Sequence, residues 1–152
     1  MQTFAAAVRS AMAMVLALAA LGATWPQPRL LAAGGTVALS PTSATLAAGQ
    51  SVALTLTAEP PSGSTLGAWT IDIGYDPAKA SIACSAAAES LCNAGYASGV
   101  VRANGDVLPG ATAAITVATL TITAAAGLAN GDTILLSVNT ARLASDEGVT
   151  HT

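Results

Sequence analysis

The chain has very few of the side chains that enzymes use for chemistry. Its 152 residues include one histidine, two cysteines and five lysines or arginines, and only 9% are charged. The histidine, His151, is the penultimate residue, where chains fray, so it is a poor base for a Ser-His-Asp arrangement. Zinc needs three or four thiolate or imidazole ligands, which this chain lacks once its cysteines pair. We expect a protein that is not an enzyme, with no catalytic residue, metal or cofactor.

Cations are also scarce. After Ala33 the only ones are Lys79, Arg102 and Arg142, whereas all eight carboxylates of the chain lie in that region. Without a basic patch there is no electrostatic footprint for nucleic acid or for an anionic membrane surface. Both partner classes are excluded.

Long apolar runs are absent except near the N-terminus. Residues 11–23 (AMAMVLALAALGA) follow a positive charge at Arg9 and are too few to cross a bilayer, which takes about 20 residues. This pattern is typical of a secretory signal peptide. The sequence therefore predicts a secreted, extracellular protein with no membrane span in the mature chain.

Two pairs of small residues, at 22–23 and 32–33, offer cleavage points, and the prolines in residues 25–28 (WPQP) break any continuing helix. We expect processing at the second pair, which makes 1–33 the signal peptide and 34–152 the binding domain. An uncleaved N-terminal anchor is the alternative.

Cys84 and Cys92 are separated by seven residues. In an oxidising compartment this spacing predicts a local structural disulfide. A redox or metal role is the alternative, but the spacing is not CxxC and only one histidine is present.

The most informative segment is residues 66–75 (LGAWTIDIGY), in which apolar side chains alternate with small or polar ones. Trp69, Ile71, Ile73 and Tyr75 share one face, which predicts a strand with that face in a core. Asp76-Pro77 ends the strand, and Asp76 is expected to accept hydrogen bonds within its own turn.

Further strand patterns recur at short intervals and total seven or eight, which predicts an all-β sandwich or jelly roll. The clearest lie at residues 36–40, 51–59, 66–75, 114–124 and 133–139. In residues 114–124 Ile115 and Val117 are out of phase with the other apolar residues, which predicts either a bulge near Ala118 or an outward-facing hydrophobic pair.

Two Asn-Gly-Asp triplets, at 104–106 and 130–132, suit tight turns because asparagine and glycine tolerate positive φ. Neither continues into the acidic spacing of a calcium loop, so we interpret both as plain turns.

Sugar binding uses outward aromatic faces, but the alternation turns Trp69 and Tyr75 inward. Tyr96 is the one candidate ligand contact, and its alternative role is a loop residue packed against the disulfide. A flat strand face of threonines and small residues suits docking of another protein better than sugar binding.

Several segments resemble the cohesin-like domains of secreted bacterial proteins, a group within the carbohydrate-binding-module-like β-sandwich superfamily. They are the opening TVALSPTSATLAAGQSVALTLTAE, the strand and turn LGAWTIDIGYDPAKASI, the stretch CNAGYASGVVRANGD and the late strand ATLTITA. The resemblance spans about residues 36–139.

The resemblance implies a nine-stranded jelly roll and an extracellular role in polysaccharide breakdown. Cohesins bind dockerin modules through one face and carry out no catalysis, so a dockerin-like protein partner is implied. Cellulose-binding modules share the fold, which leaves a polysaccharide-binding module as one alternative function and a structural or adhesive surface domain as another.

The sequence departs from this family near its end. Cohesins close with one further strand near the first, whereas residues 140–152 (TARLASDEGVTHT) are largely polar. We therefore expect a jelly roll that lacks its last strand and has an open sheet edge.

Overall fold

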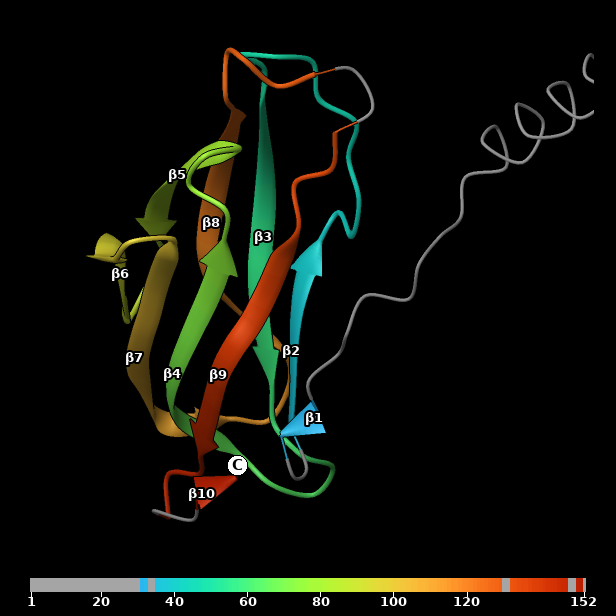
Figure 1. Ribbon diagram of the computed structural model, residues 1–152. Coiled ribbons are helices and arrows are strands. Elements are labelled where there is room, and N and C mark those ends of the chain that lie inside the picture. Colours follow the sequence, from blue (N-terminus) through green and yellow to red (C-terminus); the bar gives the residue numbers. More distant parts are fainter. Residues whose placement is uncertain (1–30, 33–34, 130–131, 148–149, 152) are drawn as a thin grey trace, which may run out of the picture.

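The computed structural model describes residues 31–32, 35–129, 132–147 and 150–151. Within these ranges the only regular secondary structure is β-strand. The strands form two antiparallel sheets that pack face to face (Figure 1). No helix in this part of the chain is long and apolar enough to cross a membrane. The predicted all-β sandwich is confirmed.

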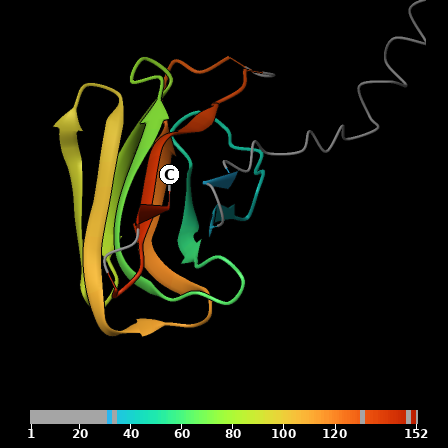
Figure 2. The same ribbon diagram turned by 90° about the horizontal axis from the view of Figure 1, so that it is seen from below.

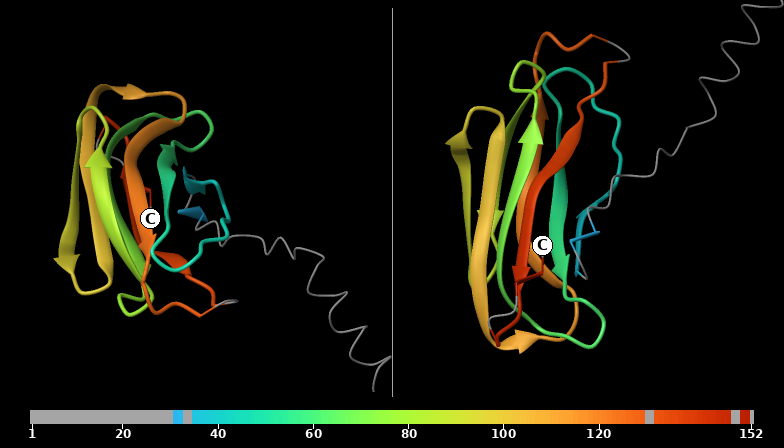
Figure 3. Two further views of the ribbon diagram at one scale, coloured as in Figure 1. Left: turned by 90° about the horizontal axis from the view of Figure 1, so that it is seen from above. Right: turned by 60° about the horizontal axis from the view of Figure 1, so that its bottom comes forward.

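The first sheet has the order β1-β2-β3-β8-β5 and the second β10-β9-β4-β7-β6, and Figures 2 and 3 show the two layers side by side. The strands in chain order are β1 (Leu31–Ala32), β2 (Gly35–Ser40), β3 (Ser51–Glu59), β4 (Leu66–Tyr75), β5 (Ala80–Ala86), β6 (Ser90–Ala97), β7 (Val100–Ala111), β8 (Ile115–Ala124), β9 (Leu136–Ala144) and β10 (Thr150–His151).

Strand β4 lies in the middle of the second sheet, between β7 and β9. Its predicted alternation is confirmed, because Trp69, Ile71 and Ile73 are buried in the core and Tyr75 packs partly buried against it. The turn that follows is also as expected, since Asp76 Oδ1 accepts a hydrogen bond from the Ala78 N–H at 2.9 Å. Because β4 pairs with β7 and β9, its alternation shows which side chains of these strands face outward.

The predicted bulge lies in β8. Leu56 of β3 pairs with Ala118 and Thr57 pairs with Thr116, which leaves Val117 as the extra residue. Val117 and Ala118 are both fully buried, because the bulge turns two successive side chains toward the core. The change of apolar phase in the sequence has this cause.

The first Asn-Gly-Asp triplet is not a turn, and that prediction was wrong. Residues 104–106 lie inside the long strand β7. A Cβ on Gly105 would fall 2.6 Å from a ring carbon of Trp69, so the glycine is needed for close packing of the indole. Of the second triplet, Asn130 and Gly131 lie outside the described residues.

The segment after Asn139 also differs from the expectation of a polar tail. It continues strand β9 as far as Ala144, with Leu143 fully buried, and a two-residue strand β10 pairs with the end of β9. The expected open edge is present nonetheless, because no described residue after β9 pairs with β2.

The predicted disulfide is present, with the Cα atoms of Cys84 and Cys92 6.0 Å apart. Cys84 lies in β5 at the edge of the first sheet, and Cys92 lies in β6 at the edge of the second. The bond therefore joins the two layers along one side of the sandwich.

Replacing both cysteines with serine is expected to lower the free energy of unfolding by roughly 2–3 kcal/mol, because the unfolded loop is no longer constrained. Urea unfolding of the double variant beside the oxidised parent measures this difference. Equal unfolding midpoints would contradict it.

Asp146 links the start of β4 to the end of β7 at one end of the sandwich. Its carboxylate accepts hydrogen bonds from the Thr65 hydroxyl and, at 3.2 Å, from the Gly110 N–H. These bonds, the Thr65 bond foremost, lower the pKa of Asp146 below its usual value. The carboxylate thereby holds the start of β4 close to the end of β7.

Because its folded-state pKa is depressed, Asp146 stabilises the fold above the ordinary aspartate pKa of about 3.9, and this contribution is lost as the pH falls further. Asp146→Asn should therefore be less stable than the parent at pH 7, and the difference should shrink as the pH falls below about 3.9. Thermal unfolding across that range measures it, with Glu147→Gln as the charge-matched control. A difference that does not change with pH would contradict this role.

Candidate functional site

Two rows of side chains cross the outer face of the second sheet. Because Ile71 points inward, its neighbours Thr70 and Asp72 point outward. Cross-strand pairing aligns the first row as Leu91, Asn104, Thr70 and Arg142, and the second as Asn93, Arg102, Asp72 and Thr140. These eight residues and Tyr96 are called the second-sheet face below.

Asp72 and Arg102 form a bidentate ion pair in the middle of this face. Arg102 Nε donates to Asp72 Oδ1 and Arg102 Nη2 donates to Oδ2, each at 2.6 Å. Hydrogen bonding to Asp72 raises the pKa of the Arg102 guanidinium above its usual value. Two parallel charge-assisted bonds hold the guanidinium plane in one orientation and neutralise both charges.

Tyr96 lies over this pair. The Arg102 Cζ atom is 3.7 Å from the centre of the Tyr96 ring, within the range of a cation–π contact. Tyr96 belongs to strand β6 and is 45% exposed. One ring face is therefore occupied by the guanidinium, and its function as a ligand contact stays a prediction.

Leu91 and Arg142 stand at opposite ends of the first row. Leu91 is 69% exposed, although it lies in a strand that is hydrogen-bonded to β7. Arg142 is exposed and forms no salt bridge within the described ranges. The face thus combines an apolar anchor, an aromatic ring, a neutralised ion pair and a free cation.

The outer face of the first sheet is different in chemistry. It carries the threonines that the sequence suggested for protein docking, such as Thr55 opposite Thr119. Some hydroxyls bond to each other, as Ser51 Oγ and Thr123 Oγ1 do at 2.8 Å. Binding energy concentrates on Trp, Tyr and Arg side chains, so we place the candidate site on the second sheet.

Of this face, the sequence identified only Tyr96 as a candidate contact. The alternation of β4 predicts that Asp72 faces outward. Its partner Arg102 is 30 residues away, and the pairing register between β4 and β7 cannot be predicted from the sequence near either residue. Leu91 was missed because the disulfide alone drew attention to that segment. Its phase relative to Cys92, whose side chain packs against the core, could have identified it as outward.

No three histidine, cysteine, aspartate or glutamate residues in the described part of the chain are grouped so that they could hold a metal ion. The second-sheet face offers hydrogen bonding, stacking and apolar contact.

No protein-family model matches the sequence, and no curated protein is detectably similar to it. Solved structures are similar in fold. The sixth cohesin of scaffoldin B from Acetivibrio cellulolyticus, solved in complex with a dockerin, superposes with a TM-score of 0.62 at 14% identity and covers 78% of this chain and 92% of its own.

Two further cohesins have similar scores. The cohesin module of a family 33 glycoside hydrolase from Clostridium perfringens gives a TM-score of 0.61 at 12% identity, over 78% of this chain and 87% of its own. A non-cellulosomal cohesin from the archaeon Archaeoglobus fulgidus gives 0.58 at 11% identity, over 79% and 84%. The chain is thus a cohesin-like jelly-roll sandwich, and identities this low show the fold alone.

Proposed function

We propose that this chain is a secreted, non-catalytic binding module that docks a dockerin-type protein through the second-sheet face, as part of extracellular polysaccharide degradation. The observation that carries the proposal is the cluster of exposed Leu91 and Tyr96 around the neutralised Asp72–Arg102 pair. Several structures of similar fold contain a dockerin beside the cohesin. This similarity of fold supports a dockerin-type protein as the partner.

The geometry supports docking for a physical reason. The four strands β6, β7, β4 and β9 are hydrogen-bonded to one another, so little backbone entropy is lost when a partner binds to them. The ion pair already satisfies the charges of Asp72 and Arg102, so burying them leaves no unpaired charge. Leu91 and Tyr96 supply apolar area that gains free energy when a partner covers it.

Secretion is part of the proposal and has two supports. The apolar run at residues 11–23 fits a signal peptide, and the Cys84–Cys92 bond fits an oxidising compartment. The polysaccharide context rests on the cohesin resemblance.

The test is capture of dockerin-bearing proteins from the same source on the immobilised domain. The proposal expects saturable binding of at least one dockerin, and a complete absence of partners would contradict it. Affinity electrophoresis on cellulose, xylan and chitin, with Tyr96→Ala as control, distinguishes the polysaccharide-binding alternative. Retardation that is lost in Tyr96→Ala would favour sugar binding, and negative results in both assays would favour a structural surface domain.

A further inference from the structure

Three lysine or arginine side chains lie in the described part of the chain, and two of them have partners there. Lys79 Nζ donates a hydrogen bond to the Thr133 carbonyl oxygen at 3.4 Å, and Arg102 pairs with Asp72. Arg142 is exposed and forms no ion pair within the described residues. Among the three, Arg142 alone is thus left without a partner in this part of the chain, and it lies on the second-sheet face.

The carboxylates nearest to Arg142 in the second sheet are engaged or are separated from it. Asp72 lies in the next row on the neighbouring strand, and both of its carboxylate oxygens bind Arg102. Asp146, beyond the end of β9, accepts the two bonds described above. Asp106 lies on β7, and β4 lies between β7 and β9. None of these three carboxylates therefore neutralises Arg142.

Arg142 stands at one end of the first row of the second-sheet face, and Leu91 stands at the other end. The row crosses four strands, so three strand spacings of about 4.8 Å place the two Cα atoms roughly 14 Å apart. A standard interface covers about 800 Å² of each partner and is wider than this row. A partner that docks on Leu91 therefore reaches Arg142 as well.

We propose that Arg142 selects the partner through a carboxylate, so that the preferred dockerin carries an aspartate or glutamate where it meets β9. This inference rests on the proposed function. A guanidinium that is buried at an interface without an opposite charge weakens binding, whereas its planar fork binds a carboxylate through two parallel hydrogen bonds. A dockerin with a neutral or basic residue at this point is therefore disfavoured.

The charges of the rest of the domain sharpen this selection. Arg102 is already neutralised by Asp72 and stacks on Tyr96, so it contributes little charge discrimination of its own. Carboxylates outnumber cations in the described part of the chain, so an acidic side chain of a partner is disfavoured over most of the surface. Arg142 is the place on the second-sheet face where such a side chain is favoured, which fixes the orientation of the partner as well as its identity.

Titration calorimetry of a dockerin that binds the secreted protein tests this role. Arg142→Glu should weaken binding by about 30-fold or more, because two carboxylates then face each other, and Arg142→Gln by about five-fold or more. Equal affinity of Arg142→Glu and the parent would overturn the inference and leave the proposed function intact. A parent that binds no dockerin would overturn both.

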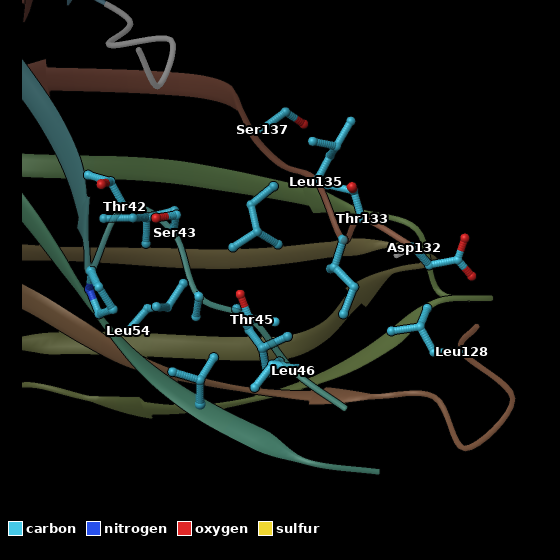
Figure 4. Close-up of a pocket in the computed structure, with 17 residues that line it drawn as sticks. Thr42, Ser43, Thr45, Leu46, Leu54, Leu128, Asp132, Thr133, Leu135 and Ser137 are labelled. Carbon is cyan, nitrogen blue, oxygen red and sulfur yellow. The ribbon is translucent and has the colours of Figure 1, made fainter. Parts of the chain in front are cut away.

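Lys79→Glu is the matched control, because it changes the net charge by the same amount at a site away from the second-sheet face. The Lys79 partner Thr133 borders an apolar hollow of about 650 Å³ between residues 41–46 and 132–137 (Figure 4). No residue of the second-sheet face lines this hollow. Binding to Lys79→Glu should stay within about two-fold of the parent. A loss equal to that of Arg142→Glu would indicate a general charge effect and overturn the inference.

The salt dependence of binding separates an ion pair from a loss of packing. The affinity of the parent should fall more steeply with rising salt concentration than the affinity of Arg142→Gln, because salt screens the charge pair that only the parent can form. Equal salt dependence of the two proteins would overturn the inference.

Charge exchange identifies the partner residue. Each exposed aspartate or glutamate of the bound dockerin is replaced in turn with lysine, and every variant is titrated into the parent and into Arg142→Glu. One replacement should weaken binding to the parent and restore binding to Arg142→Glu by about ten-fold or more, since it re-forms the pair with its charges reversed. Restoration by none of the replacements would overturn the inference.

Discussion

Replacing Leu91 with glutamate is expected to weaken binding of a dockerin partner by about 30-fold or more, the effect of losing a hot spot worth about 2 kcal/mol. Leu91 is the most exposed large apolar side chain of the second-sheet face and adjoins Asn104, in the row next to Arg102. A glutamate there removes apolar contact and forces an unpaired carboxylate into the interface. Titration calorimetry of the variant against the captured dockerin measures the loss.

Leu108→Glu is the matched control. Leu108 is 77% exposed and lies on the same second sheet, but beyond the part of β7 that forms the two rows. The substitution makes the same chemical change at similar exposure, so binding should stay within about two-fold of the parent, as expected for a site outside a hot spot. An equal loss in both variants would point to a general charge effect rather than to a docking face.

Ile71→Ala is expected to lower the free energy of unfolding by about 2–5 kcal/mol, because it opens a cavity in the core. Ile71 is fully buried, and its cross-strand neighbours are Ala103 on β7 and Ala141 on β9. Alanines are too short to fill the space, so little of the cavity can collapse. A domain of this size has only about 5–15 kcal/mol of stability, so the loss is a large fraction of the total.

Urea unfolding at pH 7 measures this change, and Leu135→Ala serves as the control because Leu135 is 74% exposed. The control should stay within about 0.5 kcal/mol of the parent. A loss at Ile71 as small as that at Leu135 would mean that the side chain of Ile71 is not packed in the core between the two sheets.

The features that the sequence predicted correctly depend on local patterns. The period of two in β4 identifies its buried face within ten residues, and the bulge in β8 appears as a change of phase within the same strand. The disulfide follows from the short spacing of Cys84 and Cys92. Each of these needs no knowledge of which strands pair.

The errors arise where a distant contact decides the local structure. Gly105 resembles a turn residue, but it lies within a strand because the Trp69 ring packs against its backbone. The end of β9 was missed because its pairing with β4 shifts register between Val138 and Thr140, with Asn139 as the extra residue. That shift hides the alternation that places Leu143 inside.

The candidate site could be predicted only in part for the same reason. Tyr96 is recognisable as an aromatic residue without a place in an alternating pattern. Its stacking on Arg102, and the bond from Arg102 to Asp72, depend on the register between β6, β7 and β4. A single sequence does not contain that register in any local pattern.

The central claim is that the second-sheet face docks a dockerin. The most direct test is titration of purified dockerin modules from the same source into the secreted protein, alongside its Leu91→Glu and Leu108→Glu variants. Our account predicts saturable one-to-one binding that is retained in Leu108→Glu and lost in Leu91→Glu. Binding of no dockerin, or equal binding to all three proteins, would contradict it.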